Sequence, residues 1–129
     1  MDDLATRGHV VVCLEDDRVL LIREVRSGQV SYVAPGTAIQ GDETPGRAAI
    51  RAARQQLGVD VTVTELFFAD TESGVEHFFF LAELESDHDT SWDEPVLASD
   101  PVSATAVRRA AIRGYPVRPF ELARRLASR

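Results

Sequence analysis

Residues 35–59 read PGTAIQGDETPGRAAIRAARQQLGV, and this stretch decides the fold. Thr44 is a good helix N-cap, and Pro45 fits the first helical turn, because its missing N–H would have no partner there. Apolar side chains then recur at helical spacing as far as Leu57. Gly58 follows them at the position where a helix commonly ends on a glycine. The stretch therefore predicts a glycine loop followed by an amphipathic helix.

Apolar or alternating segments on both sides of this helix predict β-strands. The chain thus reads as a mixed α and β domain. The predicted strands cover residues 9–14, 19–23, 30–34, 59–70 and 74–84, and two further helices are predicted at residues 103–112 and 120–127.

The glycine loop and the helix together resemble the box of the Nudix hydrolase family. That box is a Gly, five residues, a Glu, seven residues, Arg-Glu, an aliphatic, any residue, Glu-Glu, any residue, a Gly and an aliphatic. Glu43, Arg51, Gly58 and Val59 match it. The resemblance implies an α/β fold, a Nudix-like α/β/α sandwich with a mixed β-sheet between helices, formed by residues 1–129 as a single domain.

The family resemblance also implies a chemistry. Its members are pyrophosphohydrolases that cleave a nucleoside diphosphate linked to another group, with Mg²⁺ as cofactor, and they often form homodimers. We therefore expect a nucleotide-like small molecule as the ligand and consider a homodimer possible on the same grounds.

Four defining positions of the box differ in this chain. Thr37 replaces the opening glycine, and Ala52, Gln55 and Gln56 replace three glutamates. The last three positions share one helix face, where carboxylates would converge on Mg²⁺. An alanine offers no ligand, and the two glutamines offer only neutral amide oxygens. Our hypothesis is that hydrolysis is impaired or absent and that the domain binds a nucleotide-like ligand.

Glu43 is the only box carboxylate that remains, so it is the candidate catalytic residue and a weak candidate metal ligand. The structural alternative is that a Glu43–Arg51 ion pair ties the loop to the helix, with Arg51 and Gly58 as structural residues of the box. The resemblance suggests four candidates for substrate binding, each with a structural alternative as a surface ion pair, a turn glycine or a core aromatic: Arg23, Tyr32, Gly36 and Phe78. The three histidines show no metal-ligand spacing.

Composition and charge limit the partners and the cellular location that we expect. The net charge of −7 argues against a long nucleic acid as partner. The chain has no apolar run long enough for a membrane span, so we expect no membrane partner. It has a single cysteine, Cys13, and its start lacks the features of a secretory signal, so we expect a cytoplasmic protein.

The charges are unevenly distributed along the chain. Residues 83–100 hold seven acids and no basic residue, whereas residues 108–129 hold seven arginines and one acid. Two alternative functions follow from this pattern. One is an active Mg²⁺- or Mn²⁺-dependent hydrolase that uses Glu43 and carboxylates of the 83–94 segment. The other is a protein-interaction module with a basic C-terminal helix.

Overall fold

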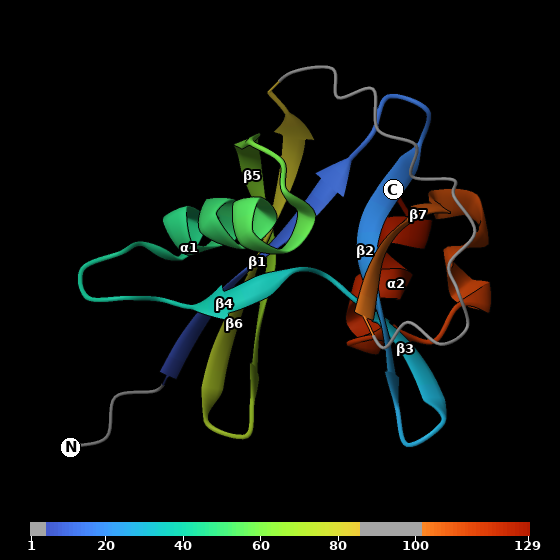
Figure 1. Cartoon of the computed structure of the whole chain (residues 1–129), viewed down its shortest axis with the longest axis horizontal. Coiled ribbons are helices and arrows are strands. Elements are labelled where there is room, and N and C mark those ends of the chain that lie inside the picture. The colour runs from blue at the N-terminus through green and yellow to red at the C-terminus, as the bar shows by residue number, and fades with distance from the viewer. Residues whose placement is uncertain (1–4, 86–101) are drawn as a thin grey trace. The chain divides into compact units, whose positions relative to one another are not determined.

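The computed structural model describes residues 5–85 and 102–129 (Figure 1). Their contacts divide the chain into two compact units. Unit 1 comprises residues 1–12 and 35–88, and unit 2 comprises residues 13–34 and 89–129. Each unit contains both parallel and antiparallel strand pairs.

The described residues of unit 1 form four strands and one α-helix. The strands lie in the order β5-β6-β1-β4, in which only the β6–β1 pair is parallel. Its elements are β1 (Ala5–Cys13), β4 (Gly36–Ala38), α1 (Pro45–Ala52), the π-helical turn η1 (Ala53–Leu57), β5 (Val61–Glu72) and β6 (Val75–Leu84).

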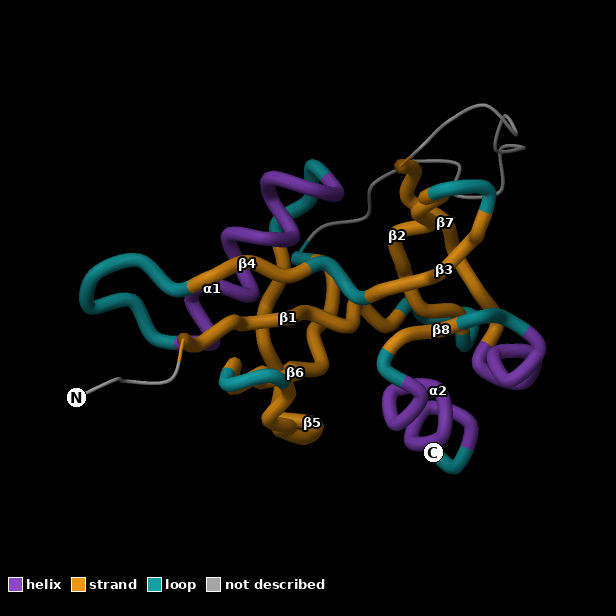
Figure 2. The backbone as a smooth tube through the Cα atoms, turned by 90° about the horizontal axis from the view of Figure 1, so that it is seen from below, coloured by secondary structure: helices purple, strands orange, loops and turns teal. Residues whose placement is uncertain are grey.

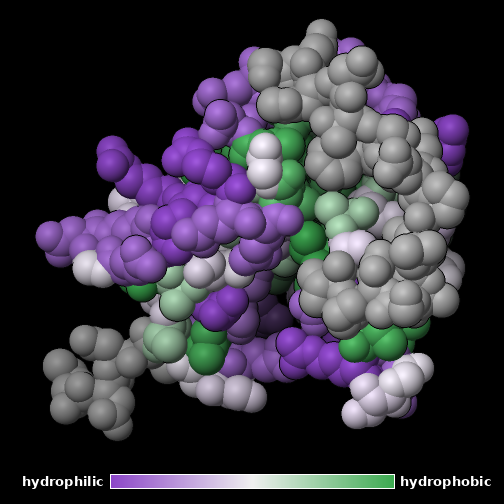
Figure 3. All heavy atoms as spheres, viewed as in Figure 1, coloured by the Kyte–Doolittle hydropathy of each residue, from purple (hydrophilic) through white to green (hydrophobic). Residues whose placement is uncertain are grey.

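The helix α1 has the termini that the sequence predicts. The Thr44 hydroxyl accepts a hydrogen bond from the Arg47 amide at 3.2 Å, and Pro45 opens the first turn. Gly58 ends η1 in the left-handed conformation, with φ of 70°. Hydrophilic side chains gather over α1 and η1 on the face shown in Figure 3. The buried face is made of small side chains instead: Ala48, Ala49, Ala52 and Ala53.

Small side chains let α1 approach β1 closely. A Cβ on Gly8 would lie 2.1 Å from the Pro45 carbonyl oxygen and 3.0 Å from the Ala49 nitrogen. Glycine is therefore the residue that permits this backbone contact between strand and helix. The contact holds the start of α1 in place over the sheet of unit 1.

The strands of unit 2 lie in the order β7-β2-β3-β8, in which the β3–β8 pair is parallel and the others are antiparallel. Figure 2 shows α2 beside β8, and α2 buries Leu122, Ala123 and Leu126. The elements are β2 (Arg18–Arg26), β3 (Gln29–Val33), β7 (Val102–Arg108), the 3₁₀ turn η2 (Arg109–Gly114), β8 (Val117–Arg118) and α2 (Phe120–Ala127).

The helix predicted at residues 103–112 is wrong. Residues 102–108 form β7, which pairs with β2 over its whole length, from Val102 opposite Glu24 to Arg108 opposite Arg18. Alanine and arginine favour a helix by intrinsic propensity, but tertiary pairing overrides that weak preference. Val102 and Val107 are β-branched residues that suit a strand. A short 3₁₀ turn follows, and the helix predicted at 120–127 is confirmed.

Candidate functional site

Glu43 and Arg51 form a bidentate ion pair in unit 1. Arg51 Nη2 lies 2.7 Å from Glu43 Oε1, and Arg51 Nε lies 3.0 Å from Glu43 Oε2. The Gln40 amide donates to Glu43 Oε1 at 3.1 Å, and Arg51 Nη2 also donates to the Ala38 carbonyl at 2.8 Å. Both carboxylate oxygens therefore already accept hydrogen bonds, and the pair ties the loop to the helix.

The ion pair shifts both groups toward their charged forms. The hydrogen bond from Arg51 holds the pKa of the Glu43 carboxyl below its ordinary value, against a smaller opposing effect of burial. The same bond raises the pKa of Arg51. Glu43 is thus held as a carboxylate engaged by a cation, which makes it a poor general base.

The Gln56 side chain forms two hydrogen bonds with the backbone of Gly36. Its Nε2 donates to the Gly36 carbonyl at 2.8 Å, and its Oε1 accepts from the Gly36 amide at 3.3 Å. Arg7 Nη2 donates to the same carbonyl at 3.2 Å. Both lone pairs of that carbonyl oxygen are therefore occupied. A glutamate at position 56 could accept from the amide, but its carboxylate could not donate to the carbonyl.

Gly36 is required by packing and not by a turn. Its backbone is not among those with positive φ, whereas that of Gly41 is, with φ of 52°. A Cβ on Gly36 would lie 2.0 Å from His9 Nδ1. Any other residue would collide with the His9 ring, so the close approach fixes glycine here.

The residues at the other substituted positions of the box offer few ligands to a metal cation. Ala52 has no exposed surface, and Gln55 Oε1 makes only a long contact of 3.5 Å with Arg51 Nη1. Within residues 5–85 and 102–129, no three His, Cys, Asp or Glu side chains gather as a metal-binding group. The residues of this box therefore do not fit a Mg²⁺ ion, which needs several oxygen ligands.

A histidine pair that the sequence analysis missed lies next to this site. His9 Nε2 and His77 Nδ1 are 2.8 Å apart. The His9 ring stacks on Phe79 at a centroid distance of 4.4 Å, and Phe79 stacks on Phe68 at the same distance. The parallel register places His9 opposite Phe79 on β6, so a pairing of distant strands brings these rings together. No local spacing in the sequence indicates it.

The predicted substrate-binding residues fall in both units. Phe78 in unit 1 is half-buried and pairs in register with Gly8. Arg23 and Tyr32 are in unit 2, directly opposite each other on β2 and β3, and Ser103 faces Arg23 from β7. Arg23 Nη1 and Ser103 Oγ are buried and have no hydrogen-bond partner among the residues that the structure describes. Two such atoms at one register position call for an explanation, because buried polar groups are normally satisfied.

The two charged segments differ in what the structure describes. Most of the acidic segment that was proposed to supply carboxylates lies outside the described residues, while Glu83 and Glu85 are exposed. In α2, Glu121 pairs with both Arg124 and Arg125. The basic helix is thus partly neutralised by its own acid. None of the described helices is long and apolar enough to cross a membrane.

Solved structures identify the fold. A NUDIX hydrolase from Nitrosomonas europaea superposes with a TM-score of 0.75 at 16% identity, over 100% of this chain and 73% of that one. An ADP-ribose pyrophosphatase from Streptococcus suis gives 0.68 at 17%, over 98% and 92%. The ORF135 protein of E. coli gives 0.66 at 18%, over 95% and 86%. The predicted fold class is confirmed: an α/β Nudix fold with a mixed sheet and helices.

The family follows from the sequence match. The NUDIX domain model matches residues 5–113, which include most of both units, so the chain belongs to the Nudix family. A search of curated proteins finds no match. The family generally uses a divalent metal such as Mg²⁺.

Proposed function

We propose that this chain is a Nudix domain that binds a nucleotide-like anion without a metal ion and does not hydrolyse it. One observation carries the proposal: the Gly36 carbonyl is occupied by Gln56 Nε2 at 2.8 Å and Arg7 Nη2 at 3.2 Å. By resemblance, this backbone is the part of the loop that approaches the metal or phosphate in active members. Here it is bound by an amide and a guanidinium.

The guanidinium opposes a cation at this position. Arg7 donates to the Gly36 carbonyl oxygen, so a metal on the same oxygen would lie within a few ångströms of a positive charge. At that separation, the repulsion between a divalent cation and a guanidinium amounts to several kcal/mol even at a high effective dielectric. The carboxylate that could offset it, Glu43, is already paired with Arg51.

The same guanidinium favours an anion. Among the described residues Arg7 makes one side-chain hydrogen bond, to Gly36, which leaves its other N–H groups for a ligand. A guanidinium presents several donors in a planar fork that suits phosphate oxygens. Arg7 is half-buried on β1, where a hydrogen bond to an anion is screened less than on the open surface.

Unit 2 supplies separate support for ligand binding. Within the described part of the chain, the buried Arg23 Nη1 and Ser103 Oγ have no hydrogen-bond partner, and Tyr32 lies next to Arg23 on the neighbouring strand. An unpaired buried donor costs free energy that a bound polar group would recover. The aromatic ring beside it suits a planar group such as a base.

ADP-ribose and two arginine variants test the proposal. We expect Arg7→Gln to weaken ADP-ribose binding in EDTA about tenfold, the size expected for a lost charge-assisted hydrogen bond. Arg47→Gln is the matched control, because Arg47 is exposed on α1 and has no side-chain ion pair among the described residues. Calorimetry gives the affinities, and chromatography of the same mixtures detects hydrolysis products.

The opposite results are equally clear. Equal affinities of wild type and Arg7→Gln for ADP-ribose would mean that Arg7 does not bind the ligand. Turnover of ADP-ribose in Mg²⁺ or Mn²⁺, lost in Glu43→Gln, would instead support the active-hydrolase alternative. Failure of every variant to bind ADP-ribose, with a stable protein complex that depends on residues 118–129, would support the interaction module.

A further inference from the structure

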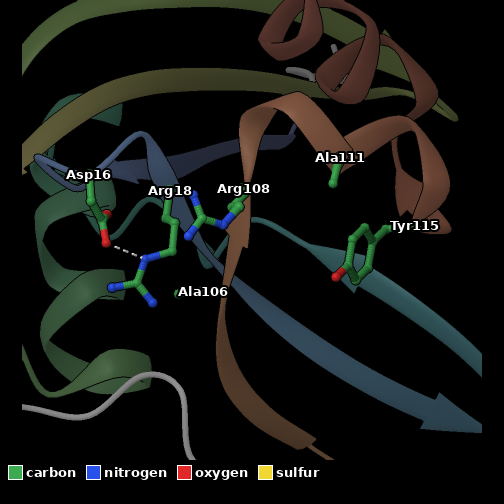
Figure 4. A pocket seen from close by; sticks show the side chains of 6 residues that line it. All are labelled: Asp16, Arg18, Ala106, Arg108, Ala111 and Tyr115. Atoms are coloured by element: carbon green, nitrogen blue, oxygen red, sulfur yellow. Dashed lines mark hydrogen bonds and ion pairs between the residues drawn. The ribbon is translucent and has the colours of Figure 1, made fainter.

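Unit 2 contains a small polar pocket that includes no residue of the Nudix box. Its volume is about 290 Å³. This lies at the lower end of the range for small-molecule sites, so it suits a compact group. Figure 4 shows its lining residues, which come from the turn before β2, the start of β2, the end of β7 and the segment after β7: Asp16, Arg18, Ala106, Arg108, Ala111 and Tyr115.

Two arginines face each other across this pocket. Arg18 and Arg108 are directly opposite on the antiparallel strands β2 and β7, so their side chains leave the same face of the sheet. Like charges in this arrangement destabilise a strand pair. Asp16 offsets Arg18, whose Nε lies 2.6 Å from Asp16 Oδ2. Asp16 is the one acid among the described residues that line the pocket, and it pairs with Arg18 and not with Arg108.

Arg108 is the arginine of the pocket that can receive an anion. It is exposed, and its side chain makes no hydrogen bond or ion pair with the residues that the structure describes. Its neighbour Arg109 differs, because it pairs with Asp17 at 2.7 Å and donates to the Arg129 carbonyl at 2.9 Å. The guanidinium of Arg108 therefore keeps all its donors for a ligand.

The rest of the lining is small or carries a hydroxyl. Ala106 is two residues from Arg108 on the same face of β7, and the methyl groups of Ala106 and Ala111 leave room between the charged side chains. Tyr115 is 38% exposed, and its ring packs edge-to-face on Tyr32 at 5.1 Å. It presents a phenolic hydroxyl and an accessible ring at the pocket.

We infer that this pocket binds a phosphate group, held by the Arg108 guanidinium, with the Tyr115 hydroxyl as a further donor and Arg18 beside it as a second positive charge. A phosphate offers more acceptor oxygens and more charge than a carboxylate, which matches two arginines placed side by side. The phosphate can be free inorganic phosphate or part of a nucleotide, and the Tyr115 ring distinguishes the two, because only a nucleotide brings a base to stack on it.

The test is a titration of the full chain with inorganic phosphate and with AMP, followed by backbone amide shifts of residues 106–115. We expect Arg108→Gln to weaken binding of both probes about tenfold, as for a lost charge-assisted hydrogen bond. Arg108→Lys, which keeps the charge, should retain part of the affinity. That result would show that the loss of binding in Arg108→Gln is not caused by misfolding. Arg113→Gln is the matched control, because Arg113 is exposed in the same unit but does not line the pocket.

Each outcome decides between the possibilities. Tighter binding of AMP than of phosphate, with the difference lost in Tyr115→Leu, supports the site and identifies a nucleotide. Equal binding of both probes, weakened by Arg108→Gln alone, supports the site for free phosphate. Equal losses in Arg108→Gln and Arg113→Gln would mean diffuse surface charge and would overturn the inference, as would no saturable binding.

Discussion

Replacing Gln56 by glutamate restores a carboxylate of the family box and should nevertheless destabilise the protein. Gln56 Nε2 donates to the Gly36 carbonyl at 2.8 Å, and a carboxylate at the same place would set two acceptors against each other. A typical intramolecular hydrogen bond contributes about 0.5–1.5 kcal/mol net. Arg7, which also reaches Gly36, offers the new carboxylate a partner and limits the loss.

We therefore expect Gln56→Glu to lower the free energy of unfolding by about 1 kcal/mol. In a domain of this size that corresponds to roughly 3–5 °C in Tm. The assay is urea denaturation in EDTA, so that no metal contributes to stability. Adding Mg²⁺ should not restore the loss, because Ala52 and Gln55 still supply no carboxylate.

Gln55→Glu is the matched control for this experiment. It introduces the same charge one residue earlier, at an exposed position that touches Arg51 only at 3.5 Å. A glutamate four residues after an arginine forms a favourable helix pair, so we expect stability equal to or slightly above wild type. If Gln56→Glu proves as stable in EDTA as Gln55→Glu, the hydrogen bonds from Gln56 to Gly36 do not stabilise the protein, and the reasoning is refuted.

Two further predictions concern the scaffold of the box. Gly8→Ala should destabilise the protein by about 3 kcal/mol, because the new Cβ would lie 2.1 Å from the Pro45 carbonyl oxygen. Gly114→Ala is the control and should be near neutral, because the new Cβ would have no atom within 4 Å. The urea midpoints of the two variants are compared, and equal midpoints would contradict the close packing of α1. Glu43→Gln should lose stability at neutral pH, because the pKa of Glu43 is lowered in the folded state by Arg51. The stabilisation by ionised Glu43 is complete above its ordinary pKa of 4.5 and disappears as pH falls through the lowered pKa, so the unfolding curves of wild type and Glu43→Gln should converge in acid. A difference in stability that persists at low pH would exclude the ion pair as its source.

Local signals explain the parts of the fold that the sequence predicts correctly. Thr44, Pro45 and Gly58 act through their own backbone and its nearest hydrogen bonds, so the limits of the box helix can be read without the rest of the molecule. The break between the strands predicted at residues 59–70 and 74–84 is similar, because the turn residues Ser73 and Gly74 both have positive φ.

Contacts between distant strands explain what was missed. The strand β7 mixes residues that favour a helix with β-branched residues that favour a strand, and its pairing with β2 decides the outcome. The short strands β4 and β8 exist for the same reason, each as a partner of a longer strand. Sequence patterns describe a segment, whereas these elements depend on its neighbours.

The candidate site shows the same division. The missing carboxylates at positions 52, 55 and 56 are visible in the sequence, as is the Glu43–Arg51 pair that the structure contains. What replaces the carboxylates is not visible, because the contact of Gln56 with Gly36 joins a helix to a strand 20 residues away. The proposal of metal-free binding therefore depends on the structure.

The most direct test of that proposal is the affinity of the wild-type chain for ADP-ribose, measured by calorimetry in EDTA and again in Mg²⁺, with hydrolysis products quantified in both. We expect the same affinity in both solutions and no product, because Arg7 and Gln56 occupy the Gly36 carbonyl. Binding that appears only with Mg²⁺, or any Mg²⁺-dependent release of product, would contradict it.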